Sequence, residues 1–172
     1  MSRSLVSALI LLAWSSVSAE TNWEKYLAYP SPEYATRVFK IEYSPNTYGA
    51  KHGYFAPDLD ILRNQVLGRD TASFNLAVRL LKNTDGGLLE EVVALLASSI
   101  RPNPNLFLTE ISNSEISDNL LKFVLKYPGL EYIDRMDARN YEIEMRRVAM
   151  LSVEEQSLQN IKEKCLKLIE HQ

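Results

Sequence analysis

The chain has two histidines, the side chains that most readily transfer protons near neutral pH. His52 lies in a segment rich in glycine and tyrosine, and Asp58 and Asp60 follow it closely. One imidazole beside two carboxylates could act in acid–base catalysis or hold a metal ion. The spacing matches no catalytic or metal-binding motif, so the sequence favours a solvent-exposed loop histidine. It predicts no catalytic residue, no metal site and no cofactor. His171 is next to the last residue.

No motif for a catalytic nucleophile is present in the sequence. The chain has no Gly-x-Ser-x-Gly, no phosphate-binding glycine loop and no His-Glu-x-x-His. Its single cysteine, Cys165, falls on the apolar side of a predicted helix, which favours a packed thiol over a reactive one. An intermolecular disulfide is the alternative. A lone cysteine cannot form an internal disulfide, so the fold must depend on its hydrophobic core.

Aromatic residues are concentrated between Trp23 and Phe55. The first four have a spacing that suits a helix face covering the core, with a ligand surface as the alternative: Trp23, Tyr26, Tyr29 and Tyr34. The later aromatics lie in a loop expected over residues 46–57, where exposed side chains serve function more often than core residues do. The sequence therefore predicts these residues as the binding surface: Tyr48, His52, Tyr54 and Phe55.

The first nineteen residues have the organisation of a secretory signal peptide. Arg3 supplies a positive charge, residues 5–14 form an apolar run interrupted only by Ser7, and Val17-Ser18-Ala19 fits a cleavage site. The run is shorter than the roughly 20 residues that a membrane-spanning helix needs, although a short membrane anchor is the alternative. The sequence therefore predicts a periplasmic or secreted protein whose mature chain begins at Glu20.

Composition limits the partners of the mature chain. Its length suits a single domain, over residues 20–172. The full chain has a net charge of −3, and its basic clusters, such as Arg146-Arg147, are mixed with glutamates, which argues against nucleic-acid binding. No second apolar run reaches membrane-spanning length, so no stable membrane insertion is expected after cleavage. The lack of an Asn-x-Ser/Thr triplet favours a bacterial envelope.

Residues 58–172 are predicted to form the helical core, after an aromatic and proline-rich segment over residues 20–57. Apolar residues recur at helical spacing from Phe74 to Leu81 and again from Leu89 to Ile100. The second helix is apolar on every side near Leu96, so it is predicted to be the buried centre. Glu90 and Glu91 are expected in its first turn as partners of the helix dipole, in preference to a catalytic carboxylate pair.

Helix boundaries are predicted from capping residues. Thr71 is expected to cap one helix, Asn103 another with Pro104 at its first position, and Ser112 with Glu115 a third. A long tail helix is expected, with an interruption near Ser152.

An N-terminal helix is predicted to begin after Ser31, with Pro32 first, and to continue to Tyr43. The alternation of Phe39, Ile41 and Tyr43 with charged residues allows a strand there instead.

The predicted fold class is all-α, with about seven helices packed as antiparallel hairpins, in an arrangement related to α-solenoids of the HEAT type. Helix-hairpin arrays present surfaces to other macromolecules more often than they catalyse. The sequence therefore predicts an exported, non-enzymatic protein-interaction module of the bacterial periplasm, with a protein as partner. Two alternatives stay open: an immunity or inhibitor protein against an exported toxin, and an envelope hydrolase with a site formed by His52 and carboxylates.

The signal-peptide prediction can be tested directly. Cleavage is expected after Ala19 because small residues precede the bond at positions −1 and −3. N-terminal sequencing of the exported protein should therefore begin at Glu20. Recovery of uncleaved chain alone, in the membrane fraction, would identify the first segment as an anchor.

Overall fold

A computed structural model describes residues 19–42, 56–129, 132 and 134–170. All regular structure in these residues is helical, which confirms the all-α class. The described part contains nine α-helices instead of about seven, and one short 3-10 helix. Their bounds are α1 Asn22–Ala28, α2 Pro32–Arg37, α4 Ala56–Leu67, α5 Thr71–Asn83, α6 Gly86–Ser99, α7 Pro104–Ser112, α8 Asp118–Lys126, α9 Met136–Leu151, η2 Gln156–Leu158 and α10 Gln159–Glu170.

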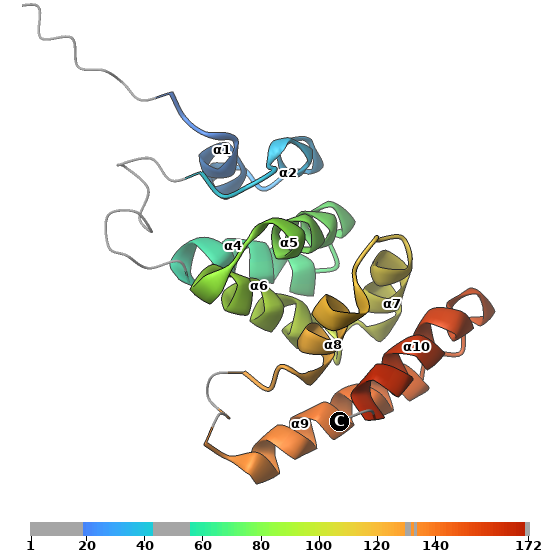
Figure 1. The fold of residues 1–172 in the computed structure, drawn as a ribbon. Coiled ribbons are helices and arrows are strands. Elements are labelled where there is room, and N and C mark those ends of the chain that lie inside the picture. Colours follow the sequence, from blue (N-terminus) through green and yellow to red (C-terminus); the bar gives the residue numbers. More distant parts are fainter. Residues whose placement is uncertain (1–18, 43–55, 130–131, 133, 171–172) are drawn as a thin grey trace, which may run out of the picture.

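The helices follow one another through space in chain order (Figure 1). Helices α1 and α2 lie at one end, α4, α5 and α6 occupy the middle, and α9 and α10 lie at the other end. Both α4 and α5 pack on α6, α6 packs on α8, and α10 packs on α8 and α9. Within the described residues no helix has the length and apolarity to cross a membrane.

Helix α6 is the buried centre of the middle layer, as its sequence predicts. Leu96 is fully buried, and so are Val92, Val93 and Leu95, whereas Ala94 is half-buried and Ser98 is exposed on one side of the helix. The expected position of the two glutamates is wrong, because α6 begins at Gly86 and its first turn contains no acidic residue. Glu90 is exposed, and Glu91 instead faces Arg63 of α4 at 3.9 Å.

The N-terminal aromatics divide between core and surface. Trp23 and Tyr26 are buried and stack with ring centroids 5.8 Å apart, and the Tyr26 hydroxyl lies 2.7 Å from Ser73 Oγ on α5. Burial raises the pKa of Tyr26 to about 12. Core packing is thus confirmed for these two, whereas Tyr29 is 73% exposed and Tyr34 is half-buried.

Helix α2 begins at Pro32 after a Ser31 cap, as predicted, but it ends at Arg37 and not near Tyr43. Residues 38–42 form neither helix nor strand, and Tyr43 lies outside the described residues. The early end has a tertiary cause. Arg79 of α5 donates to the carbonyls of Ala35, Thr36 and Val38, at 3.2, 3.1 and 2.7 Å. These bonds take the place of the backbone hydrogen bonds that a further turn of α2 would make.

Two predicted caps are displaced along the chain. Asp70, and not Thr71, caps α5, because its Oδ1 accepts from Ser73 N at 2.6 Å. Ser117 caps α8, whereas Ser112 ends α7 by donating to the Thr109 carbonyl at 2.8 Å. In each case the capping residue is the one whose side chain accepts from an orphan backbone N–H in the first turn of the helix.

Asn103 occupies the predicted N-cap position before Pro104, but its side chain serves another helix. Its Nδ2 donates to Leu67 O at 3.1 Å, at the end of α4. Its Oδ1 accepts from Arg69 Nε at 2.6 Å, and Arg69 has the left-handed φ of 69° that ends α4. Asn103 therefore fixes the turn between α4 and α5.

The interruption expected near Ser152 is confirmed. Helix α9 ends at Leu151, and Lys162 of α10 donates to Val153 O at 2.8 Å across the turn. Cys165 is fully buried on α10, and its burial raises the thiol pKa to about 12. The packed position predicted for Cys165 is therefore confirmed.

Truncating the centre of α6 should destabilise the whole fold. Leu96→Ala truncates a fully buried side chain of the helix that packs on α4, α5 and α8, so the free energy of unfolding should fall by about 2–5 kcal/mol. Chemical denaturation followed by circular dichroism measures this loss. Leu67→Ala is the matched control, because Leu67 is 37% exposed and should lose about 0.5 kcal/mol. Equal losses would show that α6 is not the centre of the core.

Candidate functional site

All four predicted binding residues lie outside the described residues: Tyr48, His52, Tyr54 and Phe55. Their role stays a prediction. The two carboxylates expected near His52 can be placed. Asp58 is buried in the first turn of α4, and Asp60 is exposed and forms an ion pair with Arg63. Neither carboxylate lines either of the two grooves described next.

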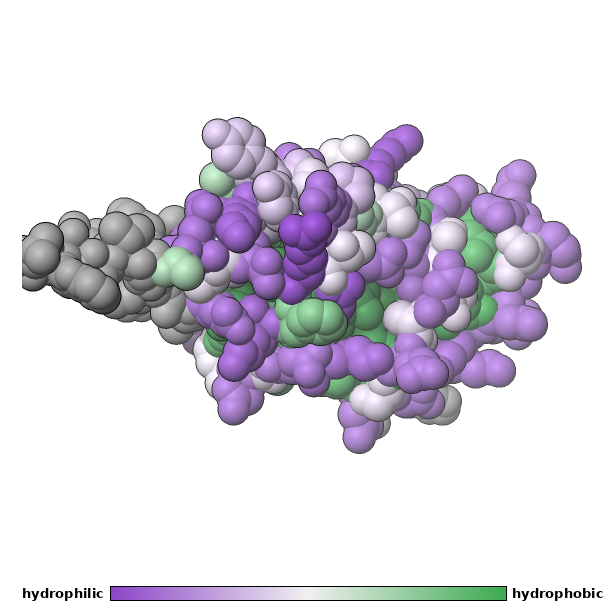
Figure 2. Space-filling model, turned by 90° about the horizontal axis from the view of Figure 1, so that it is seen from above, coloured by the Kyte–Doolittle hydropathy of each residue, from purple (hydrophilic) through white to green (hydrophobic). Residues whose placement is uncertain are grey.

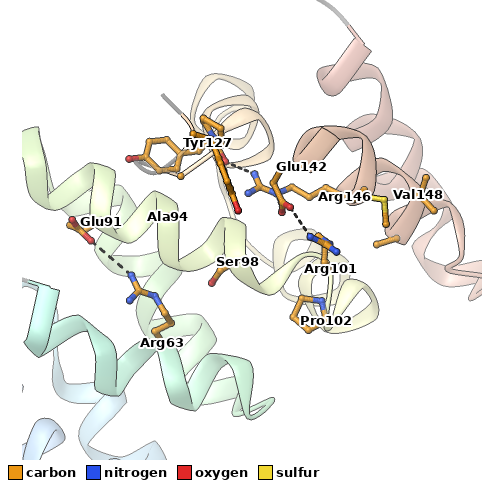
Figure 3. A pocket seen from close by; sticks show the side chains of 15 residues that line it. Arg63, Glu91, Ala94, Ser98, Arg101, Pro102, Tyr127, Glu142, Arg146 and Val148 are labelled. Atoms are coloured by element: carbon orange, nitrogen blue, oxygen red, sulfur yellow. Dashed lines mark hydrogen bonds and ion pairs between the residues drawn. The ribbon is translucent and has the colours of Figure 1, made fainter. Parts of the chain in front are cut away.

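A groove of about 840 Å³ separates α6 from α9 (Figure 3). Its floor comes from α6, with Ala94 and Ser98 one turn apart. Residues of α9 form one side, and the turns that follow α6 and α8 close one end. The lining residues are Arg63, Glu91, Ala94, Ser98, Arg101, Pro102, Tyr127, Pro128, Gly129, Tyr132, Glu142, Met145, Arg146, Val148 and Ala149.

Arg146 is the most deeply buried charged side chain of the groove, with 4% of its side chain exposed. Its Nη1 donates to three carbonyls at the end of α8, those of Val124, Leu125 and Tyr127, at 3.5, 3.3 and 2.5 Å. These carbonyls carry the negative end of the α8 dipole, which a guanidinium stabilises. Arg146 thus holds α9 against the end of α8 and sets the depth of the groove.

Glu142 connects this buried arginine to the rim. Its two carboxylate oxygens accept from different arginines, Arg146 Nε at 3.2 Å and Arg101 Nη1 at 2.7 Å. The chain of contacts runs from α8 through α9 to the turn after α6 (Figure 3). The Arg101 side chain is 44% exposed, so part of its guanidinium faces solvent at the groove edge.

A second ion pair lies at the other end of the groove. Arg63 contacts Asp60 on its own helix and Glu91 across to α6, the latter at 3.9 Å. Between the two charged ends lie Ala94 and Ser98, and the Ser98 hydroxyl donates to Leu95 O at 2.6 Å. The groove thus has an uncharged centre and two ends where each charge has an opposite neighbour.

The polar side chains of the groove are engaged with one another or with their own helix. A general acid or base is normally a group whose environment shifts its pKa toward the working pH, and a nucleophile needs a base beside it. Glu142 instead lies between two guanidinium groups, and the Ser98 hydroxyl bonds to its own helix. Among the described residues, no three histidine, cysteine, aspartate or glutamate side chains form a group that could hold a metal ion.

A second groove of about 1040 Å³ lies where α2, α5 and the turn between α7 and α8 meet. Most of its lining is polar, and its basic residues are Arg69, Arg79 and Lys82. Two of these already make structural contacts, Arg69 with Asn103 and Arg79 with the end of α2. We take the groove between α6 and α9 as the candidate site because its charged ends enclose the uncharged Ala94 and Ser98.

Sequence reasoning missed this groove. In the sequence Arg146 is only one member of a basic pair, because its partners lie about twenty residues earlier, in the last turn of α8 and at its C-cap. A basic residue on the apolar side of an otherwise amphipathic helix was the available signal. No family model, curated protein or solved structure matches the chain. The site is therefore defined by its own geometry.

Removing the buried guanidinium should open the groove. Arg146→Met keeps an unbranched side chain but removes the guanidinium, which leaves the α8 carbonyls and one oxygen of Glu142 without their donor, so we expect a loss of about 3–5 kcal/mol in unfolding free energy. Arg101→Met is the control, because its ion pair is partly exposed and should cost about 0–1 kcal/mol. Denaturant titration compares the two. Similar losses would show that Arg146 does not hold α9 in place.

Proposed function

We propose that the chain is an exported, non-enzymatic protein-interaction module that acts in the bacterial periplasm. The signal-peptide pattern of the first nineteen residues supports export. A short array of helix hairpins, in the manner of α-solenoids, is the proposed architecture, and contacts between successive helices such as α5 with α6 and α9 with α10 support it. Such arrays use the surface that successive helices build together, not a single catalytic centre.

The groove between α6 and α9 is the observation that carries this proposal. Its uncharged centre, Ala94 and Ser98 with Val148 opposite, can take apolar side chains of a partner. Its charged ends, at Arg63 with Glu91 and at Arg101 with Glu142, can accept additional polar contacts without leaving a charge unpaired. Protein interfaces commonly have such an apolar middle with a polar rim.

The N-terminal end supplies a second proposed contact surface. Tyr29 and Phe39 are 73% and 71% exposed, and the Arg79 guanidinium lies 5.6 Å from the centre of the Phe39 ring. Seen from this end, side chains are mostly hydrophilic with apolar patches between them (Figure 2). Exposed aromatics beside arginine are common anchors at interfaces. The proposed binding residues Tyr48, Tyr54 and Phe55 follow Phe39 in the chain.

An immunity or inhibitor protein is a narrower form of the same proposal, in which the partner is a toxin. An envelope hydrolase centred on His52 is the competing proposal. Asp58 is buried in α4, and Asp60 is exposed but forms an ion pair with Arg63 of its own helix, which favours a structural over a catalytic role for both carboxylates. The binding protein and the hydrolase differ in which loop side chain is needed for the activity of the protein in cells.

Crosslinking in cells should capture a protein partner at the groove. We expect a photo-crosslinking amino acid at Ser98 to capture one partner, and the same amino acid at Glu163, exposed on α10, not to capture it. Arg101→Glu should reduce capture at Ser98 several-fold, because it reverses the charge at one end of the groove. Mass spectrometry of the crosslinked band gives the readout. Capture at Ser98 that Arg101→Glu leaves unchanged would argue against this groove.

Two loop substitutions separate the binder from the hydrolase in the same cells. Tyr54→Ala should weaken capture, since an aromatic anchor often contributes 2 kcal/mol or more, whereas His52→Ala should leave capture and stability nearly unchanged. Complete loss of the phenotype with a folded His52→Ala protein would overturn the non-enzymatic proposal.

A further inference from the structure

One face of helix α9 carries exposed apolar side chains outside the core, and its Val148 also lines the groove. Of the eight large apolar side chains that are exposed among the described residues, four belong to α9. Tyr141 and Met136 are each 62% exposed, and Val148 and Leu151 are 45% and 46% exposed. On the opposite face of the helix, Arg146 and Met150 are buried. Soluble monomers seldom gather exposed apolar side chains on one helix in this way.

The spacing of this face is that of a helix–helix seam. We define the α9 seam as Tyr141, Glu144, Val148 and Leu151, which stand at i, i+3, i+7 and i+10. A spacing that alternates three and four residues is the pattern by which two helices pack side by side. All four seam residues are exposed. The seam therefore has the geometry of one half of a two-helix interface.

The charges along the seam identify the occupant. Arg147 lies beside the seam, and its guanidinium makes two hydrogen bonds of 2.8 Å to the Glu144 carboxylate. In an antiparallel pair of α9 helices related by a twofold axis near residue 146, Tyr141 faces Leu151 of the second copy. In the same register, Arg147 of each copy lies next to Glu144 of the other. The seam is therefore self-complementary in charge, as an isologous interface requires.

We propose that two copies of this chain associate through the α9 seam, in antiparallel orientation. The contact is short, because residues 141–151 of a helix span about 15 Å. That is less than stable dimers usually bury, so the association is expected to be weak, with a dissociation constant in the micromolar to millimolar range. Met145 and Val148 also line the groove, so the pair would bring two grooves close to one interface.

Charge reversal at two positions tests the register. The mature chain should self-associate in sedimentation velocity, whereas Glu144→Arg and Arg147→Glu should each weaken self-association at least tenfold, because like charges then face each other. Mixing the two single variants should restore association, since one now presents two positive and the other two negative side chains. The double variant Glu144→Arg/Arg147→Glu should self-associate like the parent. Disruption of the bond within one helix cannot produce recovery on mixing.

Controls separate charge effects from unfolding. Glu163→Arg makes the same change on the exposed surface of α10 and should leave self-association unchanged. Tyr141→Ser removes an exposed seam aromatic without touching the ion pair and should weaken association while thermal melting stays within a few degrees. A parent chain that is monomeric up to about 1 mM, or single variants whose mixture stays monomeric, would overturn the proposal. A mixture that recovers only with a third protein present would also overturn it.

Discussion

The rest of this structure depends on hydrogen bonds from arginine side chains to the last backbone carbonyls of helices. The last carbonyls of α8 are buried beneath α9, and a buried carbonyl without a donor is costly. Arg146 supplies that donor to three of them, at 2.5 Å in the closest case, and Glu142 holds its guanidinium from the other side. The position of α9 against α8 follows, and with it the groove and the outward direction of the α9 seam.

The same device occurs at the other end of the molecule. Arg79 of α5 donates to three carbonyls at the end of α2, those of residues 35, 36 and 38. Arg146 of α9 donates to three carbonyls at the end of α8, those of residues 124, 125 and 127. In both cases the backbone turns away from helical geometry immediately afterwards. The only cysteine is buried as a free thiol, so no disulfide ties the ends of this chain together. Arginine-to-carbonyl contacts tie α2 to α5 and α8 to α9 instead.

This use of arginine bears on the proposed function. The guanidinium groups in the groove are engaged by carboxylates or backbone carbonyls, so they shape a surface instead of activating a reacting group. A partner that fills the uncharged centre gains area without uncovering a buried charge, because Arg146 remains covered by its own contacts. Val148 belongs to both the groove and the seam, and Met145 lines the groove beside it, so a partner protein in the groove and a second copy on the seam would meet at the same part of α9.

The sequence by itself determined the all-α class, the starts of several helices and the burial of much of α5 and α6. Apolar periodicity identified α5 and α6, Ser31 with Pro32 identified the start of α2, and the interruption near Ser152 and the packed Cys165 were also predicted correctly. These features depend on residues a few positions apart. Only the tertiary structure decided the end of α2, the cap contributed by Asn103 to α4, and the groove around Arg146. Their donors and acceptors lie from 19 to 44 residues apart, and such a pairing is fixed by how the helices pack, which periodicity does not contain.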